Sequence, residues 1–123
     1  MTVQELYASI GGNYDSAKRI LQMDKLISKF ILKFLNDASF DKLATAWEAK
    51  DGAGIFDGAH ALKGVCANLG LDALSASSSE ICEEFRPGAA RKLSDEALSA
   101  RMDKLKADYA RTIEGIRAFE AEQ

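Results

Sequence analysis

The sequence is poor in residue types that would point to several common classes of protein. It contains one proline and two cysteines in 123 residues. The cysteines, Cys66 and Cys82, lack the spacing of a metal site, so we interpret them as buried free thiols. No run is long and apolar enough to cross a bilayer, and the N-terminus lacks the basic and apolar regions of a secretion signal. We therefore expect a cytoplasmic protein that does not act at a membrane.

Positive charge is not in excess, and only one histidine is present. Lys and Arg number 16 against 19 Asp and Glu, which gives a formal net charge of -3. This balance offers no general attraction for phosphate backbones, so we do not expect a nucleic acid partner. A single histidine without nearby carboxylates or thiols on its face cannot form a catalytic triad or a closed metal site. We expect no cofactor of the protein's own.

Hydrophobic residues make up 47% of the chain, mostly at helical spacing, and we predict an all-α fold in a single domain over residues 1–123. Gly11 and Gly12 end a short first helix, and a turn-forming segment over residues 51–54 breaks the chain before the histidine. The predicted helices are a short one after Thr2 and others over residues 14–35, 40–50, 55–69, 72–85 and from 95 onward. The apolar stripe of the helix over 14–35 is Ile20, Met23, Ile27, Phe30, Ile31 and Phe34.

Short connections make successive helices pack antiparallel. The expected architecture is an antiparallel up-and-down four-helix bundle, with the short N-terminal helix packed as a lid. The segment over residues 40–50 has two possible places: it completes the hairpin of the preceding helix, or it is one of the four main helices.

The helix over residues 55–69 carries the only histidine, His60. At about 100° per residue, its apolar positions share one arc and predict a buried stripe. These positions are Ile55, Ala59, Leu62, Cys66 and Leu69. His60 lies nearly opposite the centre of that arc. Its outward side also carries Phe56, Asp57, Lys63, Gly64 and Ala67.

The residues beside His60 suit phosphoryl chemistry. An exposed imidazole is largely unprotonated near neutral pH, so a ring nitrogen can attack a phosphoryl group directly. Lys63, three residues later, can place its ammonium on the phosphoryl oxygens. Gly64 costs the helix about 1 kcal/mol relative to alanine, and open space above the imidazole would account for that cost. A tight helix crossing at Gly64 is the alternative.

Further residues are candidates for binding a partner protein. They include Phe56, Asp57 and Ala67 on the outward side of the histidine helix. Phe56 beside two small residues would form a shallow apolar rim, although Phe56 is equally suited to packing on a neighbouring helix. Lys25, Lys29 and Lys33 recur at four-residue intervals and could meet an acidic partner. A solvated helix face is the alternative for these lysines.

The segment Ala59-His60-Ala61-Leu62-Lys63-Gly64, followed by Leu69-Gly70, resembles the histidine-containing phosphotransfer (HPt) domains of multistep two-component phosphorelays. The resemblance extends more loosely over nearly the whole chain. It implies a four-helix bundle with an exposed histidine, where His60 accepts a phosphoryl group from a receiver-domain aspartate and passes it to another receiver. Lys63 would support the group, and Gly64 would keep the approach open. One departure is Ile81-Cys82, where the family often has Leu-Glu.

By the same resemblance, the partners are receiver domains of response regulators or hybrid histidine kinases, and the magnesium ion belongs to the receiver. The protein would be a monomeric phosphocarrier and not an enzyme by itself. The methionine start and the lack of linkers favour a free-standing shuttle. One other function stays open, a helical adaptor that binds a receiver or kinase without being phosphorylated. A small enzyme or metal protein that uses His60 as base or ligand is disfavoured, because no clustered carboxylate or thiol partners share the face of His60.

Overall fold

The computed structural model describes residues 1–123 as seven α-helices and one short 3₁₀ helix without strands. The predicted all-helical class is therefore confirmed. None of the helices is both long enough and apolar enough to span a bilayer. In chain order the elements are α1 (Val3–Ser9), α2 (Tyr14–Leu21), α3 (Asp24–Lys33), η1 (Phe34–Asn36), α4 (Ser39–Glu48), α5 (Gly52–Asn68), α6 (Asp72–Glu84) and α7 (Asp95–Ala121).

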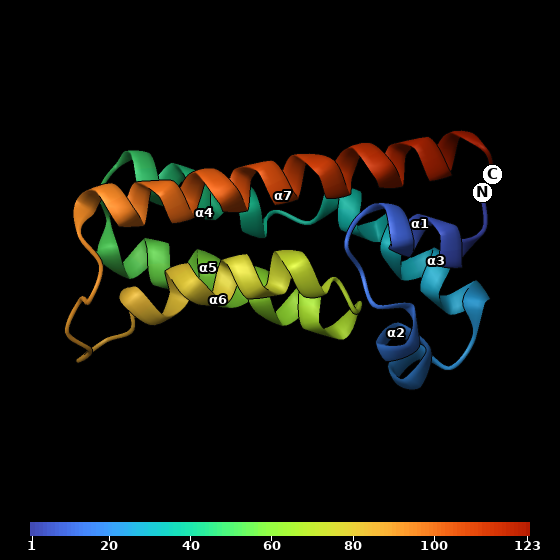
Figure 1. Ribbon diagram of the computed structural model, residues 1–123, viewed down its shortest axis with the longest axis horizontal. Helices are drawn as coiled ribbons and strands as arrows, with labels where there is room; N and C mark the ends of the chain where they lie inside the picture. The colour runs from blue at the N-terminus through green and yellow to red at the C-terminus, as the bar shows by residue number, and fades with distance from the viewer.

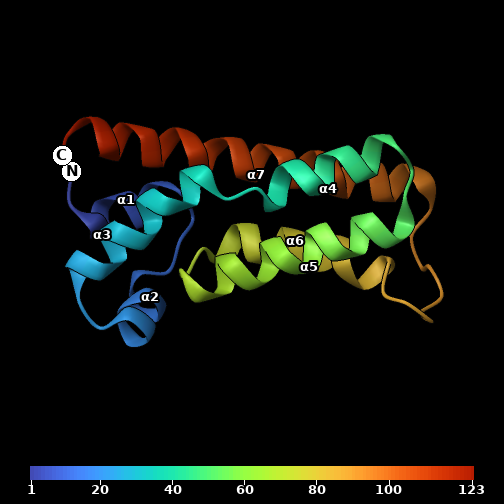
Figure 2. The ribbon, with the colours of Figure 1, turned by 180° about the vertical axis from the view of Figure 1, so that it is seen from behind.

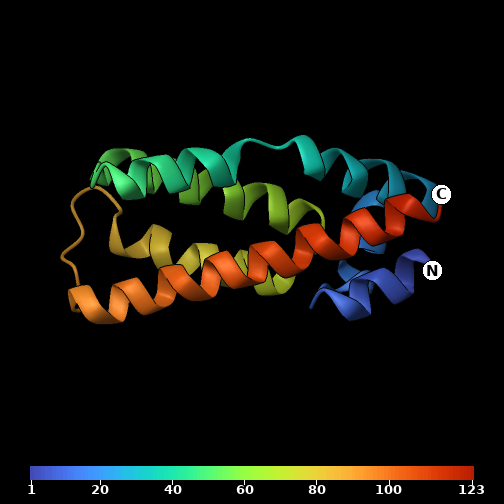
Figure 3. The same cartoon turned by 90° about the horizontal axis from the view of Figure 1, so that it is seen from above.

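The helices α4, α5, α6 and α7 run in alternating directions along the long axis (Figure 1). Packing is most extensive between α5 and its two neighbours, α4 and α6, and α6 also packs against α7. Seen from behind, α3 and α4 follow one another as an interrupted row (Figure 2). Seen from above, α7 runs the length of the molecule, with α1 beside its C-terminal end (Figure 3). One cluster of 24 buried hydrophobic residues forms the core.

The prediction of one helix over residues 14–35 is wrong. The chain leaves the helix at Gln22, whose φ of 70° is left-handed, and it turns back before α3. Asp24 accepts hydrogen bonds from the Tyr14 hydroxyl (2.5 Å) and from Lys18 Nζ (3.0 Å). In a continuous helix, residues 14 and 24 would lie about 15 Å apart along the axis, so these bonds require the turn.

The apolar stripe predicted for residues 14–35 is correct for only three of its six members, all of them after the turn. Ile20 and Met23 are each 50% exposed, and Phe30 is 36% exposed. Because the chain changes direction at Gln22, Ile20 and Met23 do not lie on the buried face of α3. The members that do enter the core are Ile27, Ile31 and Phe34.

The N-terminal segment consists of two short helices and contributes to the core. Leu6 and Tyr7 of α1 are fully buried, and the Tyr7 hydroxyl donates a 2.6 Å hydrogen bond to the carbonyl of Leu69. The Asn13 N–H donates to the carbonyl of Gly70 (2.7 Å). Gly70 has a φ of 68°, which glycine adopts readily. The Leu69-Gly70 pair thus joins the α5–α6 turn to the N-terminal helices.

Helix α5 begins earlier than the sequence pattern predicts. The Asp51 side chain caps it by accepting from the Gly54 N–H (3.1 Å), so Gly52 and Gly54 belong to the helix. Gly58 brings α5 against α4: a Cβ at this position would lie 2.7 Å from the Leu43 Cα. This close approach fixes the side of α5 that faces α4.

Candidate functional site

Helix α5 exposes His60 because its other side is buried. The predicted buried stripe is confirmed: Ile55, Ala59, Leu62, Cys66 and Leu69 are at most 7% exposed. His60 and Gly64 are exposed, one turn apart. The sequence pattern therefore predicted the orientation of α5 correctly.

The imidazole of His60 is held between two neighbours. On its own helix, the Phe56 ring stacks on it with centroids 5.5 Å apart and an angle of 20° between the planes. On α6, the Cys82 Sγ lies 3.9 Å from the His60 Nδ1. Nδ1 thus faces the protein, which leaves Nε2 as the ring nitrogen available to a partner. Phe56 is half-buried: it packs against the hydrophobic core and also borders the histidine.

Lys63 lies beside the histidine on the α6 side of the helix. Its Nζ is 3.9 Å from the Glu83 Oε1, and its side chain is 36% exposed. This distance is too long for a hydrogen bond. The ammonium is therefore loosely held and can move toward a group on His60.

Glu83 and Arg86 complete this side of the site, and the sequence reasoning did not identify Arg86. Arg86 Nε and Nη2 donate to the two carboxylate oxygens of Glu83 at 3.0 and 2.8 Å. The guanidinium lies over the Phe56 ring, with Cζ 5.5 Å from its centroid. Arg86 follows α6 just before a proline, outside any helical spacing relative to His60, so only the packing of α6 on α5 reveals it. The i,i+3 spacing of Glu83 and Arg86 is a signal for their ion pair, but not for its place beside His60.

The charges around His60 affect the nearby acids. Hydrogen bonds from Arg86 lower the pKa of Glu83, and the charges of Lys63 and His60 act in the same direction. Glu83 is therefore ionised near neutral pH. Burial raises the pKa of the Cys82 thiol, although Lys63 and Arg86 oppose this effect. The sulfur that faces the imidazole is thus a neutral thiol.

Gly64 borders open space. A Cβ there would meet no atom within 4 Å, whereas a Cβ at Gly58 would overlap the backbone of Leu43. The alternative of a tight helix crossing is thus wrong for Gly64 and applies to Gly58. An unobstructed surface above the imidazole remains as the explanation for a glycine in the middle of α5.

The residues predicted to bind a partner fall into two groups. Asp57 and Ala67 are exposed on the histidine side of α5. Lys25, Lys29 and Lys33 are exposed on α3, on another part of the molecule. Of these lysines, Lys33 lines a shallow groove that reaches α5. The groove is lined by Ile20, Leu21, Phe30, Lys33, Phe34, Asp37, Val65, Asn68 and Leu69.

Both cysteines are free and fully buried, as predicted. Burial raises the pKa of Cys66 from 9.0 to about 12. The folded state therefore favours the protonated thiol more than the unfolded state does. The stability that results is fully present below pH 9 and is lost as the pH rises toward 12. We found no group of three or more His, Cys, Asp or Glu side chains placed to hold a metal ion.

We expect the free energy of unfolding to decrease by about 1 kcal/mol per pH unit above pH 9 because of Cys66. Urea titrations at a series of pH values measure this slope. Cys66→Ala is the control: it is less stable near neutral pH because of the cavity, but its slope is shallower. Equal slopes for the two proteins would contradict the assignment to Cys66.

The model of one family, the Hpt domain, matches residues 32–115, which is more than half of the chain and includes the whole of α4, α5 and α6. No curated protein and no solved structure matches the chain. The helices α1 and α2 lie outside the matched residues.

Proposed function

The chain belongs to the Hpt domain family, and on this basis we propose that His60 accepts a phosphoryl group from a receiver-domain aspartate and passes it to a second receiver. Hpt domains are phosphocarrier modules of two-component systems that interact with receiver domains and kinases. The observation that supports the proposal best is the exposed His60 on α5, beside an ammonium and an unobstructed glycine.

The chemistry requires only a positioned nucleophile. His60 Nε2 attacks the phosphorus of the aspartyl phosphate; the N–P bond forms as the O–P bond breaks, and the aspartate leaves as a carboxylate. Nδ1 keeps its proton, so the ring becomes positively charged beside the phosphoryl group. Delivery to the second receiver reverses these steps. Phosphoryl transfer relies mainly on alignment and on neutralisation of the oxygens.

The remaining groups assist this step. Lys63 moves from Glu83 to the phosphoryl oxygens, and Gly64 lets the receiver approach the imidazole. Phe56, Asp57 and Ala67 border the contact area, and the exposed lysines of α3 attract the acidic pocket of the receiver. Magnesium is supplied by that pocket. We take residues 1–123 as one cytoplasmic, monomeric phosphotransfer domain, in which α4 to α7, with α3 extending α4, form the antiparallel four-helix bundle.

The proposal is tested by mixing the protein with a phosphorylated receiver domain. We expect an acid-labile, base-stable label on this chain, and its absence with every receiver of the source genome would contradict the proposal. A phosphorylation-independent adaptor is the second candidate, since the same surface would bind a receiver without transfer. Binding without label would favour the adaptor.

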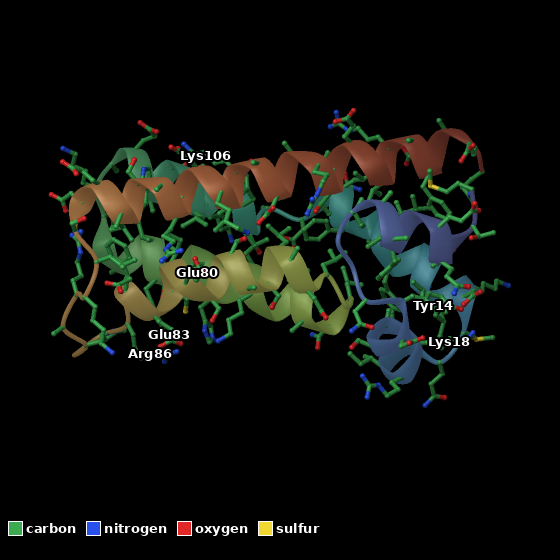
Figure 4. The ribbon with its side chains drawn as sticks, in the orientation of Figure 1. Tyr14, Lys18, Glu80, Glu83, Arg86 and Lys106 are labelled. Atoms are coloured by element: carbon green, nitrogen blue, oxygen red, sulfur yellow. The ribbon has the colours of Figure 1, made fainter.

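Lys63→Ala is expected to slow labelling by about tenfold, because one exposed charge near the phosphoryl oxygens is lost. Labelling reactions with the phosphorylated receiver, quenched at a series of times, measure this rate. Lys63→Arg keeps a positive charge and should retain more of the rate. Lys106→Ala controls for the change in net charge, because Lys106 lies on α7 and not on the helices α5 and α6 that carry the site (Figure 4). An unchanged rate in Lys63→Ala would remove this lysine from the mechanism.

A further inference from the structure

Two cations of the site meet at a single carboxylate oxygen. The Glu83 Oε1 lies 2.8 Å from Arg86 Nη2 and 3.9 Å from Lys63 Nζ. Lys63 comes from α5, and Arg86 follows the end of α6. Figure 4 shows Glu83 and Arg86 together near the C-terminal end of α6. One negatively charged group therefore holds two positive groups from different segments.

This meeting point adjoins the imidazole. Phe56 contacts both His60 and Arg86, with 5.5 Å from its ring centroid to the imidazole centroid and 5.5 Å to the guanidinium carbon. His60 is also close enough for its charge to act on Glu83. Lys63 is one turn along α5 from His60. All three charged side chains are between 36% and 54% exposed, so they can rearrange without disturbing the core.

The two contacts of Glu83 differ in strength. Its pair with Arg86 has two short hydrogen bonds, whereas the contact with Lys63 is beyond hydrogen-bond distance. An anion arriving at His60 would therefore take Lys63 away from Glu83 more easily than Arg86. Arg86 would then neutralise Glu83, which would otherwise repel that anion.

We propose that Glu83 is a resident anion that competes with the phosphoryl group for Lys63, and that Arg86 limits the repulsion by neutralising it. Both are positioning residues that set how fast His60 is phosphorylated. This inference rests on the proposed function. Removal of the Glu83 charge frees Lys63 and Arg86 to interact with the incoming phosphoryl group. Removal of Arg86 instead leaves the Glu83 carboxylate without a neutralising partner beside that group.

The test uses phosphoramidate, a small anionic donor, so that no receiver is needed. The N–P bond to His60 forms, the P–N bond of the donor breaks, and ammonia leaves. We expect Glu83→Gln to be labelled about threefold faster and Arg86→Gln about threefold slower than the wild type, since exposed ion pairs are individually weak. Phosphorus NMR and gel-shift assays measure these rates, and the differences should shrink at high salt.

Glu80→Gln is the matched control. It removes the same charge from the same helix, but Glu80, which is labelled in Figure 4, pairs with Arg101 of α7 at 3.5 Å. We expect its labelling rate to equal that of the wild type, and all three variants to keep the wild-type thermal midpoint. If Glu83→Gln and Glu80→Gln are labelled at the same rate, the inference is wrong while the proposed function stands. If wild-type His60 takes no label from any donor, both are wrong.

Discussion

His60→Gln is expected to take no phosphoryl label from a receiver domain and to keep its fold. Glutamine has no nucleophilic nitrogen comparable to that of imidazole, so the N–P bond cannot form. The imidazole is exposed, and its one polar contact is the 3.9 Å approach of the Cys82 sulfur. We therefore expect a thermal midpoint and a circular dichroism spectrum close to those of the wild type.

This variant also separates the two candidate functions. A phosphorylation-independent adaptor would keep its signalling output after His60→Gln, because the surrounding surface is unchanged. A phosphocarrier would lose the output together with the label. If the His60→Gln variant is still labelled, the phosphoryl group must be on another residue, and this result would contradict the role of His60.

Gly58→Ala and Gly64→Ala are expected to change stability in opposite directions, although both lie in α5. At Gly58, a methyl group would lie 2.7 Å from the Cα of Leu43, so α4 and α5 must separate. Overpacking of this kind typically costs 1–3 kcal/mol, and we expect about 2 kcal/mol here. At Gly64, nothing lies within 4 Å, and alanine should stabilise the helix by about 1 kcal/mol. Urea denaturation measures both changes.

A larger residue at Gly64 is expected to affect transfer without affecting the fold. Gly64→Leu projects a side chain into the space that a receiver would enter under the proposed function, so labelling by a receiver should slow markedly. The free energy of unfolding should not fall, and should rise by somewhat less than in Gly64→Ala, because leucine favours a helix more than glycine does and nothing lies within 4 Å. Phosphoramidate, which is small, should label this variant at nearly the wild-type rate. Equal loss with both donors would show that Gly64 does not serve the approach of a protein partner.

The sequence predicted α5 well because its periodicity is regular. A stripe of apolar residues at helical spacing determines which side is buried, and His60, Lys63 and Gly64 follow from it on the other side. The Asp51 cap shows the limit of this reasoning: glycines were interpreted as a break, whereas a side-chain hydrogen bond makes Gly52 the first residue of the helix.

Tertiary contacts account for what the sequence did not predict. The long helix over residues 14–35 has a continuous apolar pattern, but the bonds of Tyr14 and Lys18 to Asp24 favour a turn that no local pattern indicates. Arg86 likewise reaches the site only because α6 packs beside α5. Contacts of this kind become visible only once the packing of the helices is known, because the residues that make them are not related by a helical repeat in the sequence.

The most direct measurement follows one phosphoryl group through the protein by phosphorus NMR. After reaction with a phosphorylated receiver, we expect a single phosphoramidate signal, assigned to Nε2 of His60. This signal should disappear when a second, unphosphorylated receiver is added, as an aspartyl phosphate forms there. A phosphoryl group on another residue, or one that stays on this chain in the presence of every acceptor receiver, would contradict the role of His60 as a carrier between two proteins.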